Sequence, residues 1–349
     1  SAYFESMSGF TTTGLTMFEM AGPGMISAPH TILFWRSLTQ WVGGIGIMVL
    51  FLSLIVGAGG VAKRIFSAEG GGGRYIEEEQ GPAMSLFNIT RSVWKIYVIL
   101  TLGSIVLFYL LDMPLFQSVN HAMTALATGV FSVTSDSFAS YSAPILIATC
   151  FPMIFGATNF MVHINVFNGN WKAFFKNNEF KLLIFLIGLS TFILAWTTGV
   201  VDGIFSTVTA STTVGFSSIG EAGLIGGPGW GALQKSVLVV LMVIGGGFGS
   251  TAGAIKLIRT VVLIFALYWL VKKAILPDRA VVPFKLGDKV FSNEEILQTA
   301  VFVFAYILLL VVGSLVTMAA LPNESAINCI FDSASAQGTV GLSTGITGI

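Results

Sequence analysis

The chain has 349 residues, of which 54% are hydrophobic and only 10% are charged. This composition excludes an ordinary soluble domain, because runs of about 20 apolar residues are long enough to cross a bilayer as helices. The formal net charge is zero, so the charge gives no reason to expect a nucleic-acid partner.

Hydropathy along the chain predicts five membrane-spanning helices, at approximately residues 31–57, 91–112, 182–200, 231–271 and 296–320. A sixth segment, 143–167, contains polar residues but is long enough to span. The segment 231–271 is too long for one straight crossing, and the sequence GGGFGSTAG interrupts it. The predicted fold is therefore an all-α polytopic membrane protein in the lipid bilayer.

Basic residues indicate which helix ends face the cytoplasm. Loops 58–95, 168–181 and 272–295, with the end of the interrupted helix, hold every Lys and Arg except Arg36 and Lys235. Loops rich in Lys and Arg stay on the cytoplasmic side. We therefore expect a multi-pass protein of the inner (plasma) membrane, whose remaining loops face outward.

Each outward region contains a short half-apolar segment that is too short to span and ends in glycine and hydroxyl residues. These segments are YFESMSGFTTTGLT (3–16), VNHAMTALATGVFS (119–132), GIFSTVTASTTVGFS (203–217) and CIFDSASAQGTVGLS (329–343). Their similarity predicts an internal repeat of span, re-entrant short helix, loop and span. The predicted repeats are 1–57, 58–167, 168–271 and 272–349, of which the first lacks its first span and the fourth its last.

Irregular backbone at membrane depth is tolerated only where protein buries it or where it lines a water-filled path. Four loops that return from the outer face can converge on one axis, where backbone carbonyls replace the hydration shell of an alkali cation. Glycine helps to aim these carbonyls, because it reaches backbone angles closed to other residues. The candidate ion-binding residues are Thr12, Thr13, Gly14, Thr128, Gly129, Val130, Thr213, Val214, Gly215, Thr339, Val340 and Gly341.

The second loop departs from this pattern. In the other three loops a hydroxyl residue stands six positions before the glycine, but six positions after Thr124 the sequence has Val130. Either the loop is shifted by one residue, so that Gly129 takes the glycine's place, or one of the four loops lacks its glycine. The four loops together are called the filter. We expect the backbone of residues 128–130 to face the axis in both cases.

The sequence GGGFGSTAG, residues 245–253, resembles a dinucleotide fingerprint, but that motif needs a preceding strand and both flanks here are membrane helix. We interpret the stretch as an unwound gate between two half-helices, below the third filter loop. Alternatively, Lys256 and Arg259, which follow this stretch, are anchors whose side chains extend to the cytoplasmic interface. The predicted gate comprises Gly245, Gly246, Gly247, Phe248, Gly249, Ser250, Thr251, Ala252, Gly253, Lys256 and Arg259.

Three charged residues lie near the outer loops. Glu5 and Asp332 each precede their filter glycine by nine residues, and we expect them to cap the short helices or to attract cations. Arg36 stands near two tryptophans, and we expect it to brace the loops through hydrogen bonds.

The stretches TTTGLT, FWRSLTQWVGGIGIMVL (34–50) and GGGFGSTAGAIKLIRT (245–260) resemble the Trk/Ktr/HKT superfamily of potassium transporters, nearest its Trk branch. The resemblance covers the whole chain. It implies one central pathway, a homodimer, a cytoplasmic nucleotide-binding regulatory subunit, a gating role for the interrupted helix, and further spans before Ser1 and after Ile349. It also associates the filter glycines with potassium preference, so Val130 raises the question of sodium permeation.

The leading hypothesis is potassium uptake, driven by membrane potential, through a gated filter, with the potassium ion as substrate and no covalent cofactor. A sodium- or proton-coupled symporter, or a less selective potassium and sodium pathway, stays open on the same fold. An intramembrane enzyme needs a Ser/His, Asp/Asp or HExxH arrangement within the spans, and the sequence has none. If the protein were a sensor or receptor that conducts no ions, the four loops would have no function, and this argues against that hypothesis.

Overall fold

The structure is a computed structural model that describes residues 2–17, 25–57, 86–219, 230–277, 283–286 and 289–346. Within these ranges the regular elements are helices, one two-stranded antiparallel hairpin, β1 (Lys285–Leu286) and β2 (Lys289–Val290), and an isolated bridge between Met25 and Thr134. The predicted all-α class is confirmed. Four of the basic loop residues, Lys63, Arg64, Arg74 and Arg279, lie outside the described residues.

Four long helices follow the hydropathy of the sequence: α2 (His30–Gly57), α5 (Leu86–Leu110), α10 (Asn178–Thr198) and α15 (Asn293–Ala320). Among the described residues, α5, α10 and α15 are long and apolar enough to cross a membrane. Only 6% of the apolar window of α15 is buried by protein, which is expected of a surface that faces lipid. Helix α15 begins at a capping box, in which Ser292 and Glu295 satisfy each other's backbone amides.

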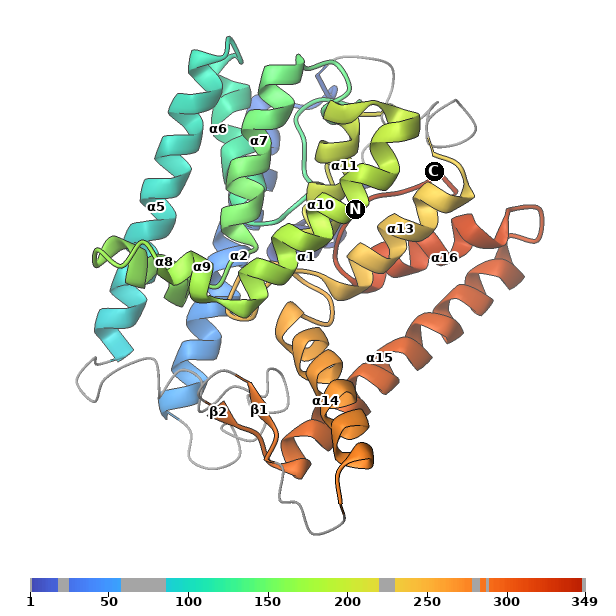
Figure 1. Ribbon diagram of the computed structural model, residues 1–349. Coiled ribbons are helices and arrows are strands. Elements are labelled where there is room, and N and C mark those ends of the chain that lie inside the picture. The colour runs from blue at the N-terminus through green and yellow to red at the C-terminus, as the bar shows by residue number, and fades with distance from the viewer. Residues whose placement is uncertain are drawn as a thin grey trace.

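Two membrane segments are broken rather than straight. The segment predicted as a sixth span consists of α7 (Ala143–Gly156) and α8 (Phe160–Phe167), which meet at 98°. Together they are long and apolar enough to cross a membrane as one bent segment, as the sequence predicts for 143–167. At the bend Asn159 accepts a hydrogen bond from the amide of Met161 and so caps the start of a new helix in another direction. The second break separates α13 (Ala232–Ile244) from α14 (Leu257–Ile275), where the glycine-rich stretch predicts it (Figure 1).

Four short helices lie inside this frame: α1 (Ala2–Phe10), α6 (Leu115–Leu126), α11 (Val200–Ser211) and α16 (Ala326–Gln337). Helix α2 packs against α1 and α6, α7 against α11, and α13 against α16. Three buried apolar clusters fill the spaces between these elements. This packing brings the ends of the four short helices together in the middle of the molecule.

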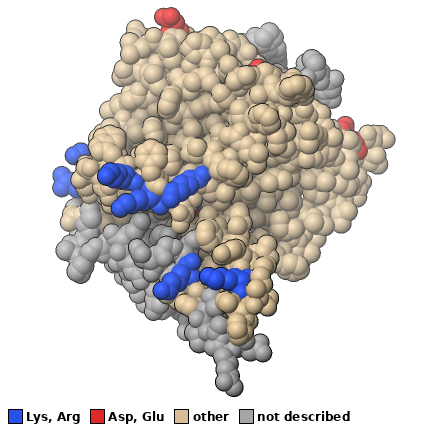
Figure 2. Space-filling model, in the orientation of Figure 1, with Lys and Arg blue, Asp and Glu red and all other residues tan. Residues whose placement is uncertain are grey.

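Basic side chains gather at one end of the described structure. In Figure 2 they lie at mid-height on the left and in the lower part of the face, over α9 (Ala173–Lys176), the start of α10 and the end of α14, whereas acidic side chains appear at the upper and right edges. The basic residues of these elements are Lys172, Lys176, Lys181, Lys272 and Lys273. This distribution agrees with the orientation predicted from the loops.

Candidate functional site

The four short helices all end in the same backbone conformation. In each, a threonine amide donates to the carbonyl three residues earlier at 2.9–3.3 Å, and the next amide donates to the carbonyl five residues earlier at 2.9–3.1 Å. These two bonds define a Schellman C-cap. The cap residue is Thr12, Thr128, Thr213 or Thr339, with φ of 54°, 52°, 56° and 54° respectively.

A threonine with positive φ is unusual, since glycine normally occupies this position of the cap and a β-branched residue is strained there. Among the described residues these four are the only threonines with positive φ. Four repetitions of one strained conformation at matched positions indicate a functional constraint. The sequence identified these threonines as candidates, but nothing in their composition indicated the left-handed backbone.

The caps also settle the register of the second loop. Two residues after the cap, Gly14, Gly215 and Gly341 have φ of 76°, 87° and 88°. Two residues after Thr128 stands Val130, which is not among the residues with positive φ. The loop is therefore not shifted by one residue, and one of the four matched positions lacks its glycine.

The four loops meet one another through these positions. A methyl group built on Gly14 would lie 1.6 Å from Cγ1 of Val130, and one built on Gly341 would lie 2.4 Å from the same atom. A methyl group on Gly215 would lie 1.8 Å from the carbonyl oxygen of Val340. The candidate residues of all four loops are thus assembled in one place, and residues 128–130 lie with the other three loops.

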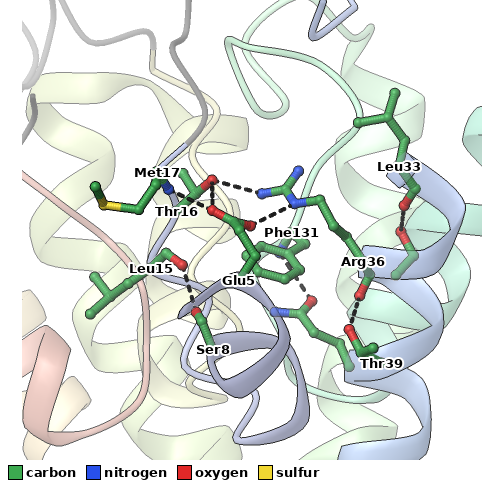
Figure 3. Close-up of polar contacts among 11 residues, drawn as sticks. Glu5, Ser8, Leu15, Thr16, Met17, Leu33, Arg36, Thr39 and Phe131 are labelled. Atoms are coloured by element: carbon green, nitrogen blue, oxygen red, sulfur yellow. Dashed lines mark hydrogen bonds and ion pairs between the residues drawn. The ribbon is translucent and has the colours of Figure 1, made fainter. Parts of the chain in front are cut away.

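A buried network holds the first loop from behind (Figure 3). The Glu5 carboxylate accepts hydrogen bonds from Thr16 Oγ1 at 2.8 Å and from the amide of Met17 at 2.5 Å. Arg36 donates from Nε to Glu5 at 3.0 Å and from Nη2 to Thr16 at 3.0 Å, and its guanidinium lies over the ring of Phe131, 4.0 Å from the centroid. The prediction that Arg36 braces the loops is confirmed. Because Phe131 belongs to the second loop, Arg36 connects two loops.

The same bracing recurs in the fourth loop. Asp332 accepts from Ser343 Oγ at 2.9 Å, from the amide of Thr344 at 2.8 Å and from Thr344 Oγ1 at 2.9 Å. The expectation that the two acidic residues cap their helices is wrong, because both carboxylates bind the loop that follows. In the second loop His121 takes this position, with Nε2 3.0 Å from Ser132 Oγ. In all three cases the side chain on the short helix and the hydroxyl residue of the loop are 11 residues apart. This regular spacing is the feature of the sequence from which the bracing contacts could have been predicted.

The interrupted segment lies against the inner ends of the loops. The amide of Gly253 donates to Thr213 Oγ1 at 2.7 Å, and a methyl group on Gly253 would lie 2.2 Å from Thr339 Oγ1. Thr251 Oγ1 donates to the carbonyl of Leu126, at the end of α6, at 3.1 Å. Residues 245–253 of the predicted gate therefore contact three of the four loop units directly.

The two breaks are hydrogen-bonded to each other. The amide of Gly247 donates to the carbonyl of Ala157 at 2.8 Å, that of Thr251 to Gly156 at 3.1 Å, and that of Phe160 to Gly249 at 3.1 Å. Protein groups thus satisfy amides that lipid could not. Further along, the Lys256 amino group donates to the carbonyl of Ala252.

The Arg259 side chain is buried inside the protein. Its exposure is 3%, and its Nη1 donates to the carbonyl of Ile255 at 2.7 Å. The guanidinium lies over the ring of Phe302 on α15, 3.7 Å from the centroid. Snorkelling is therefore wrong for Arg259, which instead connects α14 to α15.

The loops offer uncharged oxygen atoms as ligands for an ion. The matched positions carry backbone carbonyls and threonine hydroxyls, while the nearest carboxylates, Glu5 and Asp332, are occupied by hydrogen bonds to the loops. In the part of the chain that the structure describes, no group of three or more His, Cys, Asp or Glu side chains could hold a metal ion. Such an array suits a dehydrated monovalent cation.

Comparison with known proteins gives a consistent result. The family of TrkH proteins, described as cation transport proteins, matches residues 1–198 and 190–349. A cation transporter of Methanocaldococcus jannaschii is 30% identical over 99% of this chain and 69% of its own length. The Trk system potassium uptake protein TrkH of Vibrio parahaemolyticus is 32% identical over 89% of this chain and 64% of its own length.

The fold agrees with a solved structure. The crystal structure of the potassium transporter TrkH from Vibrio parahaemolyticus superposes with a TM-score of 0.79 at 28% identity, covering 98% of this chain and 70% of that one. The chain thus spans roughly two thirds of the length of the relatives that it matches.

Proposed function

Because this chain belongs to the TrkH family of cation transport proteins, we propose that it carries potassium ions across the inner membrane along the axis enclosed by the four loops. Membership of a transport family confirms that the chain is not an enzyme. We further propose that the chain consists of four repeats, 1–57, 58–167, 168–271 and 272–349, each of which contributes one loop to a common filter.

The observation that best supports this function is the shared conformation of Thr12, Thr128, Thr213 and Thr339. Residues held in sparsely populated regions cost on the order of 1–3 kcal/mol each, so four of them need a reason to persist. Positive φ at the threonine, followed in three of the four loops by positive φ at the glycine two residues later, allows the backbone to turn its carbonyls toward one side of the chain. That is the arrangement through which carbonyl oxygens replace a cation's hydration shell.

Potassium is the proposed substrate for two reasons. The loops offer neutral oxygens, which suit a monovalent cation, and the matched relatives from several bacteria are named potassium uptake proteins. Val130 favours a second candidate, a less selective pathway that also admits sodium, because one quadrant of the filter lacks its glycine.

The interrupted segment 245–253 is the proposed gate. Its contacts with Thr213 and Thr339 support this proposal, because an ion that leaves the four loops on the inner side would meet the segment there. Lys256 and Arg259, at the start of α14, are placed to transmit a pull on that helix. We propose that a cytoplasmic nucleotide-binding subunit supplies this pull and that the transporter works as a homodimer.

Uptake into liposomes containing the purified protein tests the proposal. With an imposed membrane potential, we expect potassium uptake to exceed sodium uptake and to be unaffected by sodium or pH gradients. Dependence on either gradient would establish a coupled symporter instead. Equal uptake of the two ions would favour the less selective pathway, and no uptake of either ion would contradict the proposal.

A further inference from the structure

Val130 is the one residue with a side chain at the four matched filter positions. The packing of α2 against α6, α7 against α11, and α13 against α16 places the loops in chain order around the axis. A methyl group on Gly341 would lie 3.1 Å from the carbonyl oxygen of Thr13, which closes the ring between the fourth and first loops. Gly14 and Gly215 are therefore the neighbours of Val130, and Gly341 stands opposite.

The side chain of Val130 reaches all three. Methyl groups built on Gly14 and Gly341 would lie 1.6 Å and 2.4 Å from Cγ1, and one on Gly215 would lie 2.9 Å from Cγ2. Since a carbon–carbon bond is about 1.5 Å long, Cγ1 lies no farther than roughly 3.1 Å from the Cα atom of Gly14 and roughly 3.9 Å from that of Gly341. A side chain that touches both sides of a ring lies on its axis.

Rotation about χ1 does not clear the axis. The Cβ atom of Val130 would itself lie 2.9 Å and 2.8 Å from methyl groups on Gly14 and Gly341. Valine is also restricted to few χ1 rotamers. Moving the obstruction therefore requires a shift of the loop backbone. The isopropyl group also offers no oxygen of its own to replace the water that a cation loses at this level.

We propose that Val130 closes the filter ring on its axis, so that ion passage is limited by displacement of this side chain. The proposal rests on the proposed ion pathway and adds a residue that limits its rate. It predicts that flux depends on the size of residue 130: the complete removal of the side chain in Val130→Gly opens the ring, whereas Val130→Ala, which keeps Cβ, opens it in part.

The test compares potassium uptake by liposomes containing the parent protein, Val130→Gly, Val130→Ala and Val130→Thr. We expect Val130→Gly to raise uptake about tenfold or more, the effect of a barrier lower by ~1.4 kcal/mol, and Val130→Ala to fall between it and the parent. Threonine has nearly the same shape as valine, so Val130→Thr should stay near the parent. The matched control is Val133→Ala in the same loop, because the Val133 side chain packs with Ile26 and Leu33 away from the ring.

Each outcome separates this proposal from the proposed function. If the parent conducts and neither Val130→Gly nor Val130→Ala conducts faster, the obstruction is refuted and potassium uptake stands. If only the shortened variants conduct, the obstruction is supported and uptake by the unmodified protein is refuted. An increase in Val130→Thr equal to that in Val130→Gly would identify polarity rather than size as the obstacle and overturn the proposal. Should Val130→Gly not fold, the comparison of Ala with Val decides alone.

Discussion

At the scale of single residues, Gly215 combines both demands of the filter. Its φ of 87° is closed to most side chains, and a Cβ there would lie 1.8 Å from the carbonyl oxygen of Val340. Gly215→Ser must therefore displace a carbonyl of the adjacent loop. We expect the permeability ratio of potassium to sodium to fall, measured from reversal potentials or paired uptake assays.

The matched control is Gly188→Ser on α10, where a Cβ meets no atom within 4 Å. That variant should keep the parent's ratio. If Gly215→Ser also keeps the ratio, Gly215 has no part in selectivity.

Which residues form the loops could be predicted from the sequence, because glycine and hydroxyl residues recur after each short apolar segment. The backbone of the caps could not. Threonine is a poor residue for positive φ, so the strain at Thr213 and its three counterparts becomes visible only in three dimensions. The position of Val130 could be stated only as one of two alternatives, since the register of a loop depends on how its helix ends.

At the scale of elements, the two broken segments differ in how far the sequence predicts them. Nine residues with five glycines in an apolar run predict the break between α13 and α14. The break between α7 and α8 has no such composition. Its backbone groups at Gly156, Ala157 and Phe160 are hydrogen-bonded to the other break, so it depends on contacts between distant parts of the chain that periodicity cannot reveal.

The gate makes a prediction at this scale. Deleting Phe248–Ala252 removes the hydrogen bonds from Thr251 to Leu126 and Gly156, and from the amide of Phe248 to Glu179. The segment can then no longer lie across the inner end of the loops. We expect potassium uptake to rise in the absence of any regulatory partner.

Two measurements are needed for the deletion: uptake by liposomes and the thermal stability of the purified protein. A shortened protein that melts near the parent temperature but conducts no faster would identify the segment as a structural hinge.

At the scale of the whole molecule, hydropathy, the placement of basic residues and the repeated loops together predict a helical membrane protein with four inward-turned loops. These patterns work because a bilayer restricts spanning segments to structures that satisfy their own backbone. Which loops are adjacent, and that Arg36 bridges the first and second loops through Phe131, depends on packing between repeats. A single sequence does not encode such contacts in any local pattern.

The central claim is that the four loops enclose one binding site for a monovalent cation, and thallium locates such a site directly. Thallium has nearly the size of potassium and scatters anomalously, so crystals grown with thallium in place of potassium report where the ion binds. We expect an anomalous peak on the axis between the four loops, next to the cap residues Thr12, Thr128, Thr213 and Thr339 and away from the level that Val130 occupies. Peaks found only elsewhere in the protein, with none between these loops, would contradict the account.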